Sequence, residues 1–140
     1  NGTRVIEKSC KAAHVLAGSF LNAEACAHAA IALGREVLII CAGTQDQFSL
    51  EDGLCAGMIV AEIRRAADTE PVLNDFAKAM FWSYRHNEHN LEETLLQCEN
   101  GTRLTQLGHL EDVLYCCRTN QTSTVPSLYN QVMTPLNITV

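Results

Sequence analysis

The chain has 140 residues, of which 47% are hydrophobic and 19% charged, so it is long and apolar enough for one globular domain with a buried core. Its net charge of −6 and the lack of any Lys/Arg-rich run exclude nucleic acid and membrane surfaces as expected partners. Its seven cysteines are odd in number and lack CxxC spacing, which indicates free thiols and a cytoplasmic location.

Three helices are predicted in the first half of the chain. Residues 3–13 carry apolar side chains at helical spacing, and residues 22–33 form an Ala-rich helix that ends at a glycine. A third helix is expected to begin after Ser49 and to continue to about Ala67. Asp52 stands three residues after Ser49, the position that completes a capping box.

Two apolar runs alternate with these helices and are predicted to be strands. His14–Ala17 is short, whereas Val37–Cys41 is rich in β-branched residues and apolar throughout, as in a strand covered on both faces. The order of helices and strands favours parallel pairing. The predicted fold class is therefore α/β, a layered mixed or parallel sheet with helices on both faces, in a single domain over residues 1–140.

The second half of the chain predicts additional helices. Their patterns cover residues 72–84, a segment capped by Asn90, and residues 110–117. The pair Asn100-Gly101 is interpreted as a break between short helical pieces. Short strands are expected in the tail, around Val125 and over residues 131–134.

Three loops place a glycine beside a hydroxyl or amide residue directly before a predicted helix. At such places, free backbone N–H groups and the positive end of the helix dipole favour an anion such as phosphate. Glycine lets the backbone approach the anion, and Ser or Thr hydroxyls can donate hydrogen bonds to it. The hypothesis is a shared anion site, with ordinary caps and turns as the alternative. Its candidate residues are Asn1, Gly2, Thr3, Gly18, Ser19, Asn22, Gly43 and Thr44.

Glu51 and Asp52 open the helix after the third loop and are the candidate catalytic and metal-binding residues. Carboxylate oxygens suit Mg²⁺, which takes one or two carboxylates and leaves other positions for water and phosphate oxygens. Adjacent helical side chains diverge by about 100°, so one carboxylate is expected to bind the metal while the other completes the cap. The alternative is that both only complement the helix dipole.

Three ordered motifs resemble the 2-phosphosulfolactate phosphatase family. They are Leu16–Ala23 (LAGSFLNA), Cys41–Thr44 (CAGT) and Phe48–Gly57 (FSLEDGLCAG). The opening Asn1–Arg4 (NGTR) is similar to the end of that family's Thr-Asn-Gly-Thr segment. The order of residues in the second half also agrees with the family's tail, so the resemblance covers nearly the whole chain.

The resemblance implies Mg²⁺-dependent hydrolysis of the phosphate ester of 2-phospho-3-sulfolactate to sulfolactate and phosphate, a step of coenzyme M biosynthesis, on a mixed α/β fold. Family members carry a preceding half with an Asp-x-x-Arg-Ala-Thr type segment, which nothing in this chain matches. The chain is therefore expected to be a C-terminal portion that needs the missing N-terminal half or another chain for activity. Open sheet edges would also favour a homo-oligomer.

Two other classes of function remain open from the sequence. The first is a non-catalytic module that binds an anion or its missing half without turnover. The second is a hydrolase that uses Cys41 as its nucleophile, since cysteines at strand ends act in this way in some hydrolases. Cys41 is better explained as a small residue of the core.

Overall fold

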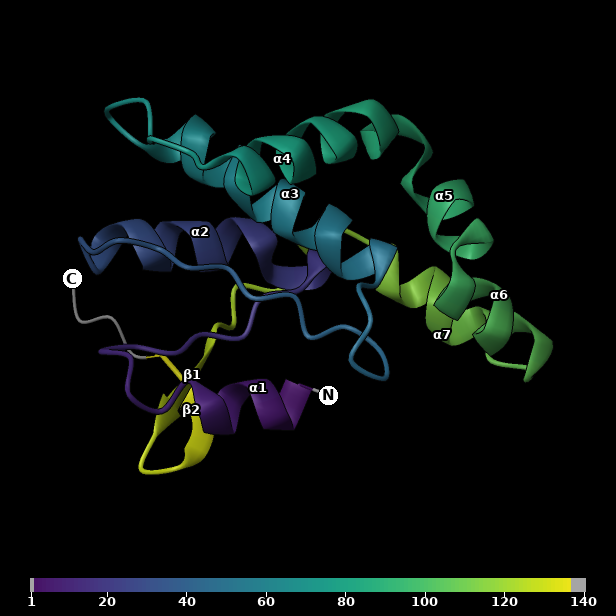
Figure 1. The fold of residues 1–140 in the computed structure, drawn as a ribbon, viewed down its shortest axis with the longest axis horizontal. Helices are drawn as coiled ribbons and strands as arrows, with labels where there is room; N and C mark the ends of the chain where they lie inside the picture. Colours follow the sequence, from purple (N-terminus) through teal and green to yellow (C-terminus); the bar gives the residue numbers. More distant parts are fainter. Residues whose placement is uncertain (1, 137–140) are drawn as a thin grey trace.

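The computed structural model describes residues 2–136 and consists mainly of helices (Figure 1). Within these residues there are seven α-helices, two 3-10 turns and one antiparallel hairpin. The elements in chain order are α1 (Gly2–Lys8), a 3-10 turn (Phe20–Asn22), α2 (Ala23–Ala32), α3 (Leu50–Ala66), α4 (Asp75–Asn87), a second 3-10 turn (Glu88–Asn90), α5 (Leu91–Gln97), α6 (Glu99–Gln106), α7 (Leu110–Cys116), β1 (Pro126–Tyr129) and β2 (Val132–Pro135).

The predicted α/β fold is wrong, because residues 2–136 contain no layered sheet. β1 and β2 pair with each other, and the His14–Ala17 run contributes only an isolated bridge from Leu16 to Ser127. Val37–Cys41 has the composition of a strand, yet within the described residues it pairs with no neighbouring strand. A strand requires a hydrogen-bonded partner as well as suitable residues, and a local pattern cannot supply that partner.

The predicted helices are largely confirmed. α2, α3 and α7 lie where the apolar spacing places them, and α3 begins directly after Ser49. The first helix is shorter than predicted: α1 ends at Lys8, where the Ser9 hydroxyl donates a hydrogen bond to the carbonyl of Val5. The predicted break at Asn100-Gly101 is also wrong, because α6 contains both residues.

α3 is the central element of the helical part. It packs against α2 on one side and α4 on the other (Figure 1). Gly57 makes the second contact close, because a Cβ atom at this position would collide with the backbone carbonyl of Met80. The backbones of α3 and α4 are therefore in direct contact.

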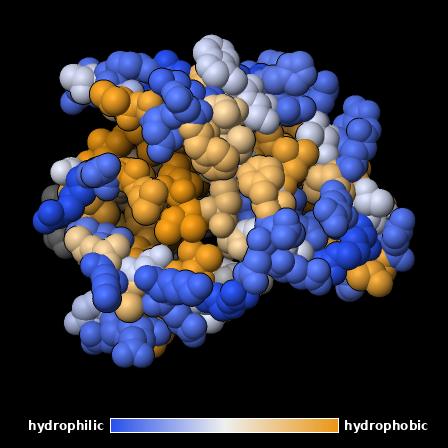
Figure 2. Space-filling view, in the orientation of Figure 1, coloured by the Kyte–Doolittle hydropathy of each residue, from blue (hydrophilic) through white to orange (hydrophobic). Residues whose placement is uncertain are grey.

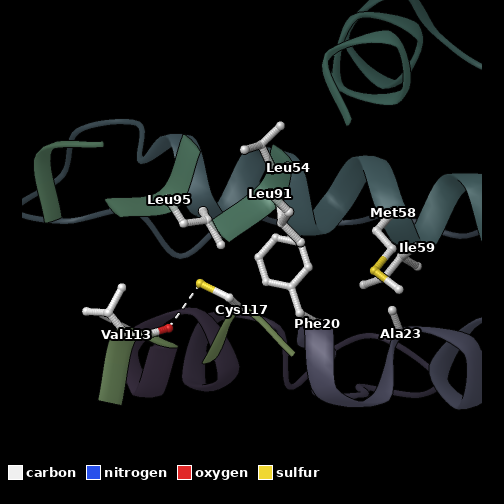
Figure 3. Packing of buried hydrophobic residues seen from close by; sticks show 9 residues of the cluster. All are labelled: Phe20, Ala23, Leu54, Met58, Ile59, Leu91, Leu95, Val113 and Cys117. Carbon is white, nitrogen blue, oxygen red and sulfur yellow. Dashed lines mark hydrogen bonds between the residues drawn. The ribbon is translucent and has the colours of Figure 1, made fainter. Parts of the chain in front are cut away.

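The main hydrophobic core joins α3 to α5, α7 and the first 3-10 turn (Figure 3). Its buried members are Phe20, Ala23, Leu54, Met58, Ile59, Leu91, Leu95, Val113 and Cys117. Leu54 is fully buried, and the Cys117 thiol donates a hydrogen bond of 3.1 Å to the carbonyl of Val113. Full burial of one such aliphatic side chain contributes about 1.5–3 kcal/mol. The cluster therefore holds the carboxyl-terminal helices on α3.

α1 and the β1–β2 hairpin lie together on the other side of α2 from α4 (Figure 1). The single tryptophan of the sequence, Trp82, lies on α4, is 66% exposed and meets the ring of Phe81 edge-on at a centroid distance of 5.0 Å. Over residues 2–136, no helix is long and apolar enough to cross a membrane.

Candidate functional site

The loop before α3 contains a tight turn over residues 44–47. Thr44 and Gln47 exchange two backbone hydrogen bonds, of 3.0 and 2.9 Å, and both residues between them have positive φ angles. Gly43 precedes this turn with φ +67°, and a Cβ atom on it would collide with the carbonyl of Gln47. Only glycine fits this position without strain, so the turn brings the loop backbone close to the start of α3.

Asp52 is bonded to this loop and does not complete a capping box. Its Oδ2 accepts a hydrogen bond of 2.6 Å from the backbone N–H of Gly43. Ser49 occupies the N-cap position of α3, but its hydroxyl donates to Thr44 Oγ1 at 3.0 Å instead of capping the helix with its oxygen. The predicted capping box is therefore wrong, and the two side chains attach the loop to the helix.

Glu51 points away from Asp52, towards the start of α6. Its Oε1 accepts a hydrogen bond of 2.5 Å from Asn100 Nδ2, and its Oε2 accepts one of 3.5 Å from the Cys98 thiol. Asn100 Nδ2 also contacts Thr44 Oγ1 at 2.7 Å and Ser49 Oγ at 3.4 Å. We call Thr44, Ser49, Glu51, Cys98 and Asn100 the polar cluster. It connects the loop, α3 and α6 at the amino end of α3.

The electrostatic environment of Asp52 differs from that of an exposed carboxylate. Burial raises its pKa above the ordinary value, the negative charge of Glu51 raises it further, and the hydrogen bond from Gly43 acts against both. The ionised carboxylate is thus incompletely compensated by its protein neighbours. A cation beside Asp52 would offset this deficit.

Asp52 lines a cavity of about 550 Å³. Gly18 of the second predicted anion loop and Ala42 of the third line it as well, so one residue of each loop reaches this cavity. The charged residues along the cavity are the basic Lys8, Lys11 and Arg35 and the acidic Glu36 and Asp52. α1 approaches the third loop as well, because Arg4 forms an exposed ion pair of 2.9 Å with Asp46. Basic residues therefore outnumber acidic ones along the cavity of an acidic protein.

Ser19 and Asn22 are engaged in holding the chain together. Asn22 is 4% exposed, and its Nδ2 donates to the carbonyls of Ala17 and Thr124 at 3.1 and 3.0 Å. Its Oδ1 accepts from the backbone N–H and the hydroxyl of Ser19 at 2.8 and 3.1 Å. In this structure the pair joins the first 3-10 turn to the tail.

The remaining candidates of the first anion loop do not form a glycine turn before a helix. Gly2 and Thr3 are exposed residues within α1 itself, and Asn1 lies outside the described residues. α1 has only seven residues. The structure thus places Gly18 and Asp52 along one cavity, with Gly43 bonded to Asp52, while Thr44 lies in the polar cluster and Thr3 on the surface of α1.

The two carboxylates fit a magnesium ion unequally. Both oxygens of Glu51 accept hydrogen bonds within the polar cluster, whereas Asp52 Oδ1 accepts none from residues 2–136. Across that same part of the chain, no group of three or more His, Cys, Asp or Glu residues is placed to hold a metal ion. Mg²⁺ commonly uses one or two carboxylates with substrate phosphates and water, so Asp52 alone fits the role of a ligand.

Cys41 lies at the edge of the cavity in an environment that disfavours its thiolate. Burial raises the pKa of Cys41, and the negative charge of Asp52 raises it further. Reactive cysteines instead lie near cations or helix amino ends that lower the thiol pKa. This environment argues against Cys41 as the nucleophile of a hydrolase.

Asn100 is the residue of this region that the sequence did not single out. The bond from Asn100 to Glu51 joins positions 49 residues apart. Gly101 permits the approach of α6, because a Cβ atom on it would collide with the carbonyl of Leu95. The signal in the sequence is the Asn-Gly pair itself, which predicts a helix break and is part of the tail on which the family resemblance rests.

A family model described as 2-phosphosulpholactate phosphatase matches residues 1–131. Two similar proteins, both called probable 2-phosphosulfolactate phosphatase, come from Caldanaerobacter subterraneus subsp. tengcongensis and Clostridium tetani. The chain is 33% identical to the first and 35% identical to the second, over 95% of its own length. It covers 54% and 55% of these relatives, so it spans about half their length.

Proposed function

The chain belongs to the 2-phosphosulfolactate phosphatase family, and we propose that it contributes the Asp52 side of a Mg²⁺-dependent phosphatase site. The substrate proposed is a small phosphate monoester with further negative charges, of the 2-phospho-3-sulfolactate type. Turnover is proposed for a polypeptide of the length of the relatives, because the present chain spans about half of that length.

The position of Asp52 is the observation that carries this proposal. The carboxylate lies at the amino end of α3, beside the cavity, with Oδ2 bonded to Gly43 and Oδ1 not bonded by any described residue. Burial, with the nearby charge of Glu51, raises the pKa of Asp52 against the opposing hydrogen bond from Gly43, which is consistent with a carboxylate whose charge is not fully compensated. A divalent cation at Oδ1 would supply that compensation, and when bound it would neutralise phosphoryl oxygens and orient water.

The protein groups around Asp52 have separate tasks in this proposal. Lys8, Lys11 and Arg35 make the cavity attractive for an anion although the chain is acidic overall. Thr44 Oγ1 accepts hydrogen bonds from both Asn100 and Ser49, so Thr44 belongs to the polar cluster and attaches the loop that carries Gly43 to α3 and α6. Thr44 and Asn100 are therefore proposed to position this loop without contacting the substrate.

Glu51 is proposed to be a positioning residue and not a metal ligand. Its two oxygens accept hydrogen bonds from Asn100 and Cys98, and unlike Asp52 it does not line the cavity. Glu51 and Asp52 therefore have different proposed roles, positioning and metal binding, which the sequence alone does not distinguish.

The test is phosphate release from 2-phosphosulfolactate by a family-length chimera, which joins this chain to the unmatched part of the Caldanaerobacter relative. Asp52→Asn should lower Mg²⁺-dependent turnover at least about 100-fold, because a ligand of the catalytic metal is lost. Glu51→Gln should retain turnover within about threefold, since the amide oxygen still accepts the bond from Asn100. Thermal unfolding of both variants is measured as the control for folding.

Full Mg²⁺-dependent turnover in the Asp52→Asn chimera would show the metal assignment to be wrong. The 140-residue chain alone should release phosphate far more slowly than about 1 per second, the lower range of ordinary enzymes. A faster rate from the purified chain alone would show that it needs no further segment.

A further inference from the structure

Most of the residues that line the cavity at Asp52 are apolar, and we call this apolar lining the groove. Figure 2 shows apolar side chains gathered on one face of the molecule. Its apolar lining includes Leu16, Leu33, Val37, Leu38, Ile40 and Ile59. Three of these, Val37, Leu38 and Ile40, are exposed although they are large and aliphatic. A contiguous exposed apolar surface of this kind marks an interaction site more often than an ordinary protein surface.

One wall of the groove is Val37–Cys41, and its side chains alternate as in a strand. Ile39 packs against the main core, while its neighbours Leu38 and Ile40 are 79% and 51% exposed. Within residues 2–136, no backbone hydrogen bond is made by Val37–Cys41. Backbone groups that become buried must find partners, so covering this wall requires an occupant that offers N–H and C=O groups as well as apolar side chains.

Residues 14–16 also line the groove and already pair with the chain elsewhere. Leu128 N–H donates to the Val15 carbonyl at 2.9 Å, and Leu16 forms an antiparallel bridge with Ser127. The lining therefore combines two non-helical segments with residues of α2 and α3, including Cys26 and Ile59.

We infer that this groove binds an extended apolar segment from the part of a family-length polypeptide that lies outside these 140 residues. The segment pairs through its backbone with Val37–Cys41 and covers Leu38 and Ile40, in the manner of β-strand addition. Relatives supply the length for such an occupant, because 46% of the Caldanaerobacter protein (100% minus the 54% covered) lies outside the match. The inference rests on family membership and not on the proposed phosphatase activity.

The experiment compares the 140-residue chain with the family-length chimera described above. Each is prepared as the parent, as Leu38→Arg and as Val72→Arg. Val72 is fully exposed and does not line the groove, so it is the matched control for adding an arginine. Two quantities are measured: the hydrogen-exchange rates of the Val37–Cys41 amides and the midpoint of thermal unfolding.

In the parent chimera, the Val37–Cys41 amides should exchange at least tenfold more slowly than in the 140-residue chain, because they gain hydrogen-bond partners. Leu38→Arg should abolish most of this protection and lower the unfolding midpoint of the chimera, yet leave that of the 140-residue chain unchanged. Val72→Arg should change neither protein.

Equal exchange rates in the chimera and the chain would overturn the inference, whether or not the chimera folds. Equal effects of Leu38→Arg and Val72→Arg in the chimera would also overturn it. Sedimentation equilibrium of the 140-residue chain provides a third arm. A dimer that Leu38→Arg dissociates and Val72→Arg does not would identify a second copy, and not the family segment, as the occupant.

Discussion

The helical region, residues 50–117, and the cavity region, residues 2–43, are both rich in aliphatic side chains but bury them to different extents. Leu54, Leu91 and Leu95 are buried between helices of the first region. Leu38 and Ile40 of the second region remain exposed. Apolar content alone therefore does not decide whether a segment becomes core.

The difference lies in how each region satisfies its backbone. A helix pairs its own N–H and C=O groups, so it needs from its neighbours only a surface against which to pack. An extended segment such as Val37–Cys41 needs both a packing surface and an edge partner. The helices of residues 50–117 find their packing surfaces within the described chain, from one another and from α2, whereas Val37–Cys41 finds no edge partner there.

The largest expected effect concerns a thiol at the boundary of the two regions. Cys55 on α3 lines the cavity, and burial, followed by the charge of Asp52, raises its pKa from 9.0 to about 12. Its thiolate population at pH 8 is thus about 1,000-fold below that of an ordinary thiol. Iodoacetamide should modify Cys55 at least that much more slowly than the exposed Cys116, as measured by peptide mass spectrometry.

The same shift has a defined sign for stability. Because the folded-state pKa of Cys55 is raised, its contribution to stability is complete below pH 9 and is lost as the pH rises towards 12. If Cys55 and Cys116 are labelled at comparable rates at pH 8, the cavity region opens readily in solution. The two regions would then differ in how often they open.

The next largest effect compares two leucines. Leu54→Ala should lower the free energy of unfolding by about 3 kcal/mol, since it removes a fully buried side chain and leaves a void. Leu38→Ala should change it by less than about 0.5 kcal/mol, because this side chain is 79% exposed. Urea unfolding of both variants of the 140-residue chain checks this. Similar losses would show that the cavity region is closed in solution.

The smallest effect tests the link between the loop and the helical region. Asn100→Ala removes the donor that contacts Thr44, Ser49 and Glu51, and should cost about 1.5 kcal/mol in the same urea assay. Asn100→Asp should cost at least as much, because its charge would face Glu51. If neither variant loses stability, the polar cluster does not hold α6 on α3.

Much of the helical region could be predicted because its signals are local. Ser49 and the apolar spacing after it place α3 nearly to the residue, and α7 follows from the same periodicity, as does α2 outside this region. The strand at Val37–Cys41 was predicted from composition that is indeed typical of strands. The prediction failed because strand formation depends on a partner that no local pattern contains.

The candidate site shows the same limit. The sequence predicts Asp52 and Gly43 as site residues from their positions beside a helix start, and in the structure Gly43 N and Asp52 Oδ2 are 2.6 Å apart. The sequence does not predict the contact of Asn100 with Glu51, because it spans 49 residues. Ser19 and Asn22 are candidates because they follow a glycine and precede a helix, yet such a polar pair serves equally well to bond the backbone, as it does here.

The position of Trp82 determines what fluorescence can report about this molecule. It is the single tryptophan, it lies on α4, and α4 is in backbone contact with α3 through Gly57. Its emission spectrum therefore follows the solvent exposure of the helical region. Rearrangement of residues 2–43 would leave that spectrum almost unchanged. A single sigmoidal unfolding curve from fluorescence would therefore report on the helical region and give no information about the cavity region. A tryptophan introduced at Val37 would make the second region visible by the same optical method.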